Sequence, residues 1–303
     1  MSAPEIFNDA TGLRFQIGAR TLLSWPMRLR RVAWSLDDVL AQRDRPLPPL
    51  GGAEGYLLTS VPETLLGRIG MAGFACHVRQ RYERYHVDLT VGHAAWAAGL
   101  SANTRQTLRR KAKKLAGVDP LDVRAYRTPD EIATFLKRAR RLSATTYQER
   151  LLDAGLPDTE TFHVLAAALA AADAVRAWLL HHEGLPIAYL WCAAEGDTLR
   201  YDHVGHDPAF GHLSPGAVLH AEALRRLFED RFGLFDFTEG EGQHKRQLAS
   251  GGTACADVVL LRPTLDNRAV LAALTGFDAT VAFGKKLARK GVAKRAGDWL
   301  RRA

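Results

Sequence analysis

Three short apolar runs in the middle of the chain have the length and spacing of β-strands. They cover residues 175–182, 185–194 and 198–205, and the turns between them contain Glu183-Gly184 and Gly196. Short runs separated by Gly-containing turns predict consecutive antiparallel hairpins. The sequence therefore predicts a three-stranded meander over 175–205.

Apolar residues recur at helical spacing on both sides of this meander. Thr128, Pro129 and Glu131 predict a helix start, because Thr can cap, Pro suits the first position and Glu can complete a capping box. The spacing predicts helices over 128–146, 162–172 and 215–232, and strands over 118–127, 235–237 and 256–263. This order of elements indicates an α/β protein with a mixed sheet.

The first part of the chain carries strand-like runs but no chemical motif. Strands are predicted at 13–23, 27–36, 55–62 and 73–78, with a short helix at 36–42 and a Pro/Gly-rich loop at 43–52. We interpret residues 1–92 as a supporting α/β region, 93–265 as the main domain and 266–303 as a basic helical tail.

The positive charge is concentrated at the end of the chain. The net charge is +8, and residues 281–303 hold eight Lys and Arg side chains against Asp298, which leaves the rest of the chain near neutrality. Phe283, Leu287 and Trp299 stand among these cations, which fits a basic amphipathic helix on an anionic membrane face. A solvated tail and a nucleic-acid contact are the alternatives.

The remaining composition predicts a globular protein of a reducing compartment. The longest apolar runs, 164–172 and 188–194, are too short to span a bilayer, and the first residues lack the pattern of a signal peptide. The cysteines are odd in number, far apart and without metal-ligand spacing. We therefore expect a cytoplasmic protein with unpaired thiols and no metal, which the tail could hold at the inner face of the membrane.

A loop rich in Gly, Pro and His leads directly into the helix predicted at 215–232. It places His212, Ser214, Gly216 and Ala217 around the helix start. Backbone N–H groups and the helix dipole at such a terminus attract phosphates. The sequence therefore predicts a seat for a phosphate-bearing ligand, with an ordinary helix start as the alternative.

A polar loop after the Phe-Asp-Phe strand holds candidate groups for proton transfer. We favour Glu239 and His244 as bases, because a loop beyond a strand end can face a bound substrate. Asp202, on the strand before the His-rich loop, is a third candidate. In a regular strand Tyr201 and His203 share one face and Asp202 takes the other. For each candidate, an exposed or locally paired polar residue is the alternative.

Four pieces of the sequence together resemble the GNAT acyltransferase superfamily, and most closely its CelD-like or BioF-like acetyltransferase branch, which is related to the Fem aminoacyl transferases. They are the basic helix 101–115, the hairpin with Gly184, Pro186 and Ala188, the segment HDPAFGHLSPGAVL with Asp207, Pro208, Ser214, Pro215 and Gly216, and FDFTEGEGQHKRQL with Asp236, Gly240 and Lys245. The resemblance covers about residues 95–262. This chain has His244 where the family usually has the Tyr that precedes the Lys.

The resemblance implies a fold, a co-substrate and an activity. The implied fold is a GNAT-like mixed, mostly antiparallel sheet flanked by helices, with residues 1–92 either a degenerate GNAT half or an unrelated support. The implied activity transfers an acetyl or other acyl group from acyl-CoA to an amine or hydroxyl in polysaccharide or cell-envelope metabolism. The acyl-CoA would bind at His212, Ser214, Gly216 and Ala217.

Lys245, Arg105 and Tyr147 are the candidate substrate-binding residues, since cations can hold an anionic acceptor or a phosphate. Two other functions stay open. A Fem-like transferase would use aminoacyl-tRNA, which the basic helix and tail would suit. A non-catalytic GNAT-like module would bind a membrane or polyanion through the tail. The acceptor, the acyl chain and the oligomeric state are not predicted.

Overall fold

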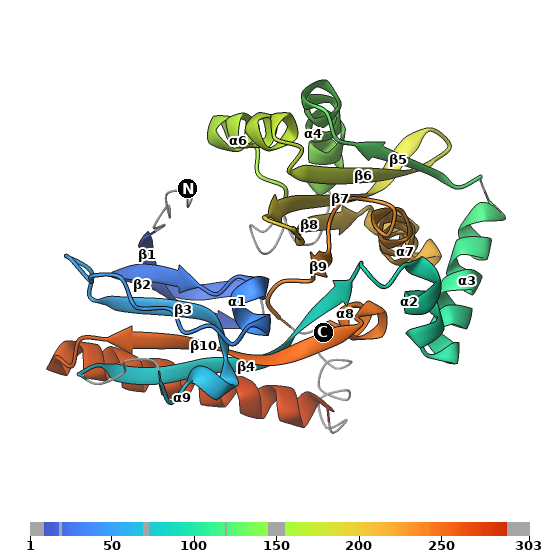
Figure 1. Cartoon of the computed structure of the whole chain (residues 1–303). Helices are drawn as coiled ribbons and strands as arrows, with labels where there is room; N and C mark the ends of the chain where they lie inside the picture. The colour runs from blue at the N-terminus through green and yellow to red at the C-terminus, as the bar shows by residue number, and fades with distance from the viewer. Residues whose placement is uncertain are drawn as a thin grey trace, which may run out of the picture. The chain divides into compact units, whose positions relative to one another are not determined.

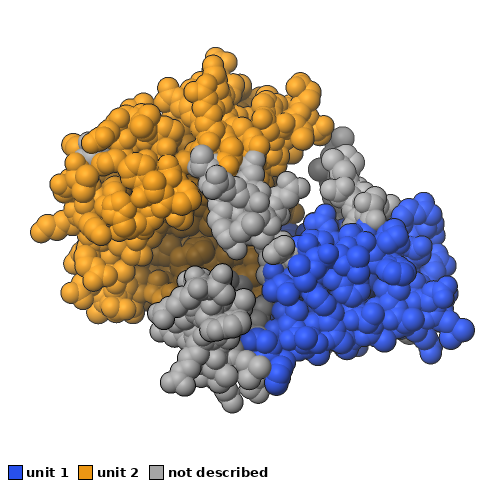
Figure 2. All heavy atoms as spheres, turned by 180° about the vertical axis from the view of Figure 1, so that it is seen from behind, with its two compact units in different colours: residues 1–81, 255–303 blue, residues 82–254 orange. Residues whose placement is uncertain are grey.

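The structure, a computed structural model, describes residues 9–17, 20–68, 73–118, 120–144, 155–240 and 242–289. The chain forms two compact units, one of residues 1–81 and 255–303 and one of residues 82–254, which Figure 2 shows in different colours. The division predicted from sequence, at residues 92 and 265, stays a prediction about domains. Each unit is described by itself below.

Unit 1 is a small sheet closed by one long helix. Its elements are β1 (Asp9–Ile17), β2 (Arg20–Ala33), α1 (Leu36–Leu40), β3 (Gly55–Pro62), the 3₁₀ turn η1 (Glu63–Leu65), the first part of β4 (Ala75–Asp88), the last part of β10 (Gly251–Leu261) and α9 (Leu265–Arg289). β1 pairs antiparallel with β2, β2 parallel with β3, and β3 antiparallel with β10. The predicted strand 13–23 was wrong, because the chain turns back between β1 and β2.

The core of unit 1 explains why α9 forms. Leu271 and Leu274 of α9 are buried against Leu13, Leu29 and Val259 of the sheet. Burial of an apolar stripe, rather than propensity alone, stabilises a helix of this kind. The described part of α9 is therefore an integral element of unit 1, and the basic residues predicted to form a tail begin in its last turns.

Unit 2 holds the meander predicted from sequence. Its elements are the last part of β4, α2 (His93–Gly99), α3 (Ala102–Ala116), β5 (Asp122–Tyr126), α4 (Pro129–Ser143), α6 (Glu160–Ala171), β6 (Val175–His182), β7 (Leu185–Glu195), β8 (Thr198–His206), the 3₁₀ turn η2 (Pro208–Leu213), α7 (Pro215–Leu227), β9 (Leu234–Asp236), α8 (Gln243–Leu248) and the start of β10. The strand order is β4-β9-β8-β7-β6-β5, and the β8–β9 pair alone within it is parallel. The predicted fold class, a mixed and mostly antiparallel sheet flanked by helices, is confirmed.

Local sequence sets the ends of these elements. The capping box of Thr128 and Glu131 is present at the start of α4, with Pro129 in its first turn. The β6–β7 turn has positive φ at both Glu183 and Gly184, the combination of a type I′ hairpin turn, whose twist matches that of the flanking strands. Both features follow the sequence prediction directly.

Helices cover both faces of the unit 2 sheet (Figure 1). One apolar cluster joins α4 and α6 to alternate residues of the meander, among them Leu179 and Trp191. The second joins α7 to the intervening residues, among them Leu180 and Leu190. The strands of this meander are therefore buried on both faces, which explains their nearly continuous apolar runs. No helix in the described ranges is both long and apolar enough to cross a membrane.

Candidate active site

The parallel pair β8–β9 separates after a short contact. Residues 198–200 of β8 pair with residues 234–236 of β9, whereas β8 stays paired with β7 as far as His206. Beyond this point the Thr238 hydroxyl donates to the Tyr201 carbonyl oxygen at 3.3 Å. In the described part of the chain, no strand pairs with the β9 side of residues 202–206. This free strand edge offers backbone donors and acceptors to a ligand.

A β-bulge at Asp202 changes which side chains face this edge. Tyr201 lies opposite Cys192 and His203 opposite Trp191, so β8 carries one extra residue at Asp202. The Tyr201 ring therefore contacts His220 of α7, whereas the His203 ring contacts Phe162 of α6. The expectation that Tyr201 and His203 share a face was wrong, because the extra residue reverses the alternation of side chains.

Helix α7 begins beside the end of β8. Ser214 caps it in the left-handed conformation, with φ 57° and ψ 48°, and Pro215 occupies the first position. A Cβ atom at Gly216 would meet nothing closer than His206 Nδ1, at 3.8 Å. The Gly216 N–H makes no hydrogen bond to another described residue, so it is one of the free donors at the positive end of the helix dipole. This terminus has the donors and the space that a phosphate needs.

A cation of the basic helix 101–115 lies at the predicted phosphate seat. Lys114 of α3 donates from Nζ to the His212 carbonyl oxygen at 2.9 Å, which brings positive charge to the turn before α7. The His212 ring is exposed and its Nδ1 lies 3.2 Å from the Ala209 carbonyl oxygen. Ser214, Gly216 and Ala217 lie together at the helix start. Their role as acyl-CoA ligands stays a prediction.

A cluster of rings fills the space between β8, α7 and α8. His220 and His244 stack with ring centroids 5.3 Å apart and planes 14° apart. The Tyr201 ring lies against both, and its hydroxyl is 3.5 Å from His244 Nε2. Phe237 closes the cluster against Tyr201 and His244. The predicted base His244 is thus part of a three-ring group with Tyr201 and His220.

Burial sets the protonation of this group. Burial lowers the pKa of His244, with a smaller contribution from the positive charge of Lys245. Burial lowers the pKa of His220 to about 3, assisted by His244 and Lys245. Burial also raises the pKa of Tyr201. At neutral pH the cluster therefore holds two neutral imidazoles, which can accept a proton, and one phenol that keeps its proton.

Lys245 contacts Glu239 through the backbone carbonyl group of Glu239. Lys245 Nζ donates to the Glu239 carbonyl oxygen at 2.7 Å, and its side chain is buried. Burial lowers the pKa of Lys245, and the nearby carboxylates of Glu239 and Asp236 partly oppose that shift. The Lys245 ammonium group therefore links residue 245 back to residue 239 of the polar loop, and its positive charge acts on the His244 ring.

A buried ion pair holds the beginning of this loop. The Asp236 carboxylate is fully buried and accepts from Arg84 Nε at 3.2 Å and Nη2 at 2.5 Å. It also accepts the Thr238 N–H at 2.8 Å, two residues past the end of β9. The pair fixes the point where β9 leaves β8 and the polar loop starts. Nothing in the sequence marked Arg84, because its partner is about 150 residues away.

The other candidates lie apart from the ring cluster. Asp202 accepts the Ala193 N–H at 3.2 Å and lies 3.2 Å from Arg200 Nη2, and burial raises its pKa to about 6. Arg105 donates to the carbonyl oxygens of Ala97, Ala98 and Leu100, where it caps α2. Tyr147 lies outside the described residues. The roles of all three stay predictions.

Two members of the ring cluster were not among the residues selected from sequence. They are His220, inside the predicted helix 215–232, and Tyr201, which was considered only as one position of an alternating strand. One signal was available for His220: helix positions 216, 217 and 220 share a face, which places His220 one turn behind the predicted phosphate seat. Within the described ranges, no group of three or more His, Cys, Asp or Glu side chains is arranged to hold a metal ion.

The separated strands, the bulge and the helix start beside them define a GNAT-type acyltransferase fold. Comparison with known families agrees, since residues 102–246 match the model of the acetyltransferase (GNAT) domain. Over that segment the chain is similar to GNAT acetyltransferase domains. No curated protein sequence matches the chain.

Solved structures similar to this chain include a synthetase domain, FemX and an N-acetyltransferase. The C-terminal domain of a protein described as a lysylphosphatidylglycerol synthetase from Agrobacterium fabrum has a TM-score of 0.51 at 14% identity, covering 76% of this chain and 73% of that one. FemX has a TM-score of 0.48 at 10% identity, covering 78% and 81%. A GCN5-related N-acetyltransferase from Kribbella flavida has 0.37 at 14%, covering 78% and 82%. At these identities the similarity concerns the fold alone.

Proposed function

We propose that the protein transfers an acetyl or other acyl group from acyl-CoA to an amine or hydroxyl acceptor. The observation that carries the proposal is the separation of β8 from β9 next to the free N-terminus of α7. One ligand with an amide-rich arm and a pyrophosphate would satisfy both features. Its arm would pair with the free edge of β8, and its phosphates would meet the Gly216 N–H and the helix dipole.

His244 is our candidate base. A neutral amine acceptor loses a proton when it attacks the thioester, and a neutral imidazole can take that proton. The low pKa of His244 supports this role at neutral pH. His244 Nε2, 3.5 Å from the Tyr201 hydroxyl, can donate its hydrogen to the hydroxyl oxygen and fix the orientation of the ring, which leaves the Nδ1 lone pair to take the proton. Glu239 and Asp202 are the alternative bases.

A Fem-like aminoacyl-tRNA transferase is the second candidate. It is supported by the basic residues of α3, of which Lys114 reaches the turn before α7. A tRNA donor would bind this surface with a strong dependence on salt, because cations displaced from phosphates are released. An acyl-CoA makes far fewer phosphate contacts and would show a weak dependence.

A thiol-release assay separates these donors. Purified protein, acetyl-CoA and a panel of small amines and hydroxyl compounds should release free CoA faster than either substrate alone. A gel-shift titration with unfractionated tRNA at low and high salt runs in parallel. Acceptor-dependent CoA release supports acyl-CoA as donor. Salt-sensitive tRNA binding without CoA release supports the second candidate. If the protein neither releases CoA nor binds tRNA, the non-catalytic module is the remaining interpretation.

We also propose that the protein associates with anionic membrane surfaces through residues 281–303. The support is the concentration of cations in this segment, together with Phe283 of α9, which is 63% exposed. Cationic residues near an acidic bilayer gain roughly 1 kcal/mol each, and exposed aromatic rings partition into the interface. In this setting an acceptor of cell-envelope or polysaccharide metabolism would be within reach.

A further inference from the structure

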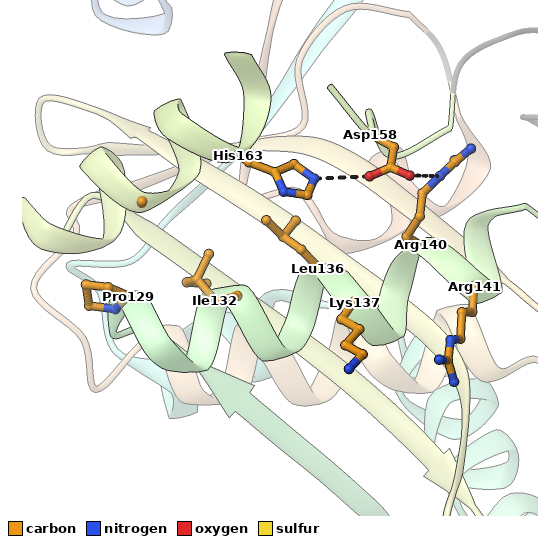
Figure 3. Close-up of a pocket in the computed structure, with 10 residues that line it drawn as sticks. Pro129, Ile132, Leu136, Lys137, Arg140, Arg141, Asp158 and His163 are labelled. Carbon is orange, nitrogen blue, oxygen red and sulfur yellow. Dashed lines mark hydrogen bonds and ion pairs between the residues drawn. The ribbon is translucent and has the colours of Figure 1, made fainter. Parts of the chain in front are cut away.

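A cavity lies in unit 2, away from α7. It has a volume of about 380 Å³ and is formed between α4 and α6 (Figure 3). These helices pack on the sheet face that carries Leu179 and Trp191, whereas α7 packs on the opposite face. The cavity is therefore separate from the candidate active site. Its volume lies at the small end of the range for sites that bind organic molecules.

The floor of the cavity is apolar. Ile132 and Leu136 point from α4 toward α6 in Figure 3, and the walls include Ala133 and Ala167. Ile132 and Leu136 belong to the buried cluster beneath the two helices. Ala133 and Ala167 are exposed, whereas Ile132 and Leu136 beneath them are almost fully buried, so a short alkyl chain or a single ring would contact mainly the two Ala side chains. Burying such a group is favourable by roughly 25 cal/mol per Å² of apolar surface.

The rim is cationic. Arg140 is held in place by the Leu156 carbonyl oxygen at 3.1 Å and by Asp158 at 3.4 Å, and Asp158 also lies 3.1 Å from His163. This row crosses between the two helices in Figure 3. Asp158 therefore has its charge matched at one end of the cavity.

Lys137 and Arg141 add unmatched charge to the α4 side of the rim. Both side chains are exposed, and neither pairs with a carboxylate among the described residues. They stand four residues apart on one helix face, where like charges destabilise a helix slightly. A bound anion would remove that repulsion. The rim thus favours a negative group beside an apolar floor.

We propose that the cavity between α4 and α6 binds an amphiphilic anion, a carboxylate or phosphate carried on a short alkyl chain or a single ring. The apolar part lies on Ala133 and Ala167, above the buried Ile132 and Leu136, and the anionic group meets Lys137 and Arg141, with Arg140 behind them. This site is independent of the proposed acyl transfer, because it uses neither the free edge of β8 nor the N-terminus of α7.

Calorimetric titration of the full-length protein with matched eight-carbon probes tests the proposal. Octanoate and octyl phosphate carry the anion, and octyltrimethylammonium carries the same chain with a positive charge. We expect both anions to bind at least about tenfold more tightly than the cation. Inorganic phosphate alone should bind more weakly than octyl phosphate, since it lacks the apolar part. Equal affinity for the three octyl probes would overturn the proposal.

Three variants locate the binding. The double variant K137E/R141E should weaken octanoate binding by at least about tenfold, because it reverses both unmatched charges. Arg138→Glu is the matched control, because Arg138 stands on the same helix but does not line the cavity. Ala133→Trp should abolish octanoate binding by filling the space above Ile132. CoA binding, measured on the same samples, should not change. If R138E weakened octanoate binding as much as K137E/R141E, the site would be wrongly placed.

Discussion

The ion pair between Arg84 and Asp236 makes the sharpest stability prediction. Replacing Arg84 by Met removes the guanidinium from a carboxylate that is fully buried where β9 ends. The hydrophobic side chain of Met fills much of the same volume, so the main loss is electrostatic. The carboxylate would then be buried without its bidentate partner. The protein would unfold more readily, or Asp236 would become protonated.

The magnitude follows from the burial of both groups. The Arg84 side chain is 5% exposed and the Asp236 side chain 0%. Breaking a buried pair by removing one partner costs about 3–5 kcal/mol, whereas replacing both partners by apolar groups is often close to neutral. The double variant R84M/D236L also leaves the Thr238 N–H without its acceptor, which costs about 1–3 kcal/mol. The double variant should therefore lose less free energy of unfolding than the two single variants lose together, by at least about 2 kcal/mol.

Urea denaturation of the wild type, R84M, D236L and R84M/D236L measures this coupling. Hydrogen exchange of peptides from β4 and β9 assigns the loss to unit 2. The single variants should each lose about 3–5 kcal/mol and open β4 and β9 first. Additive effects, or a loss below about 1 kcal/mol in R84M, would show that the pair does not hold the beginning of the polar loop.

Other consequences concern the ring cluster and the tail. His244→Ala should lower kcat by about 100-fold or more, and Tyr201→Phe should lower it less. The rate of the wild type should fall with acidity only below pH 6.5, because the lowered pKa of His244 keeps its ring neutral above that pH. His220 has its pKa lowered to about 3, so its contribution to stability is complete above pH 6.5 and is lost as the pH falls toward 3; His220→Phe should flatten that part of a stability–pH curve measured in urea. An unchanged curve would contradict the neutral, buried state of His220. Deleting 281–303 should abolish sedimentation with anionic liposomes while CoA binding persists; unaltered sedimentation would refute the tail proposal.

The sequence was sufficient for the elements with strong local signals. The capping box at Thr128 and the positive-φ turn at Gly184 are local features, and both elements formed as predicted. The predicted strand 13–23 failed because an exposed hairpin end carries Leu22 and Leu23, whose apolar character hides the turn before them. An apolar run therefore does not by itself show that a segment is one continuous buried strand.

The site could be predicted only in part, for a physical reason. Ser214 and Gly216 were placed at a helix start, as the structure has them, because a helix start has a local signature, whereas their role as ligands stays a prediction. Tyr201 was misplaced because a β-bulge is set by the partner strand, so no pattern within β8 reports it. Arg84 was missed because its role depends on a contact that only the folded sheet creates. Local features such as a helix start can be recognised in the sequence, whereas contacts between residues far apart in the chain cannot.

Calorimetric titration with CoA tests the central claim most directly. The Gly216 position has open space and an ordinary backbone conformation, so Gly216→Trp should fill the phosphate seat without disturbing the fold. Gly276→Trp in unit 1, equally open, is the matched control. We expect CoA to bind the wild type and G276W with a Kd of about 1–100 μM and to bind G216W at least about tenfold more weakly. Absence of CoA binding to the wild type, or equal binding to all three proteins, would contradict it.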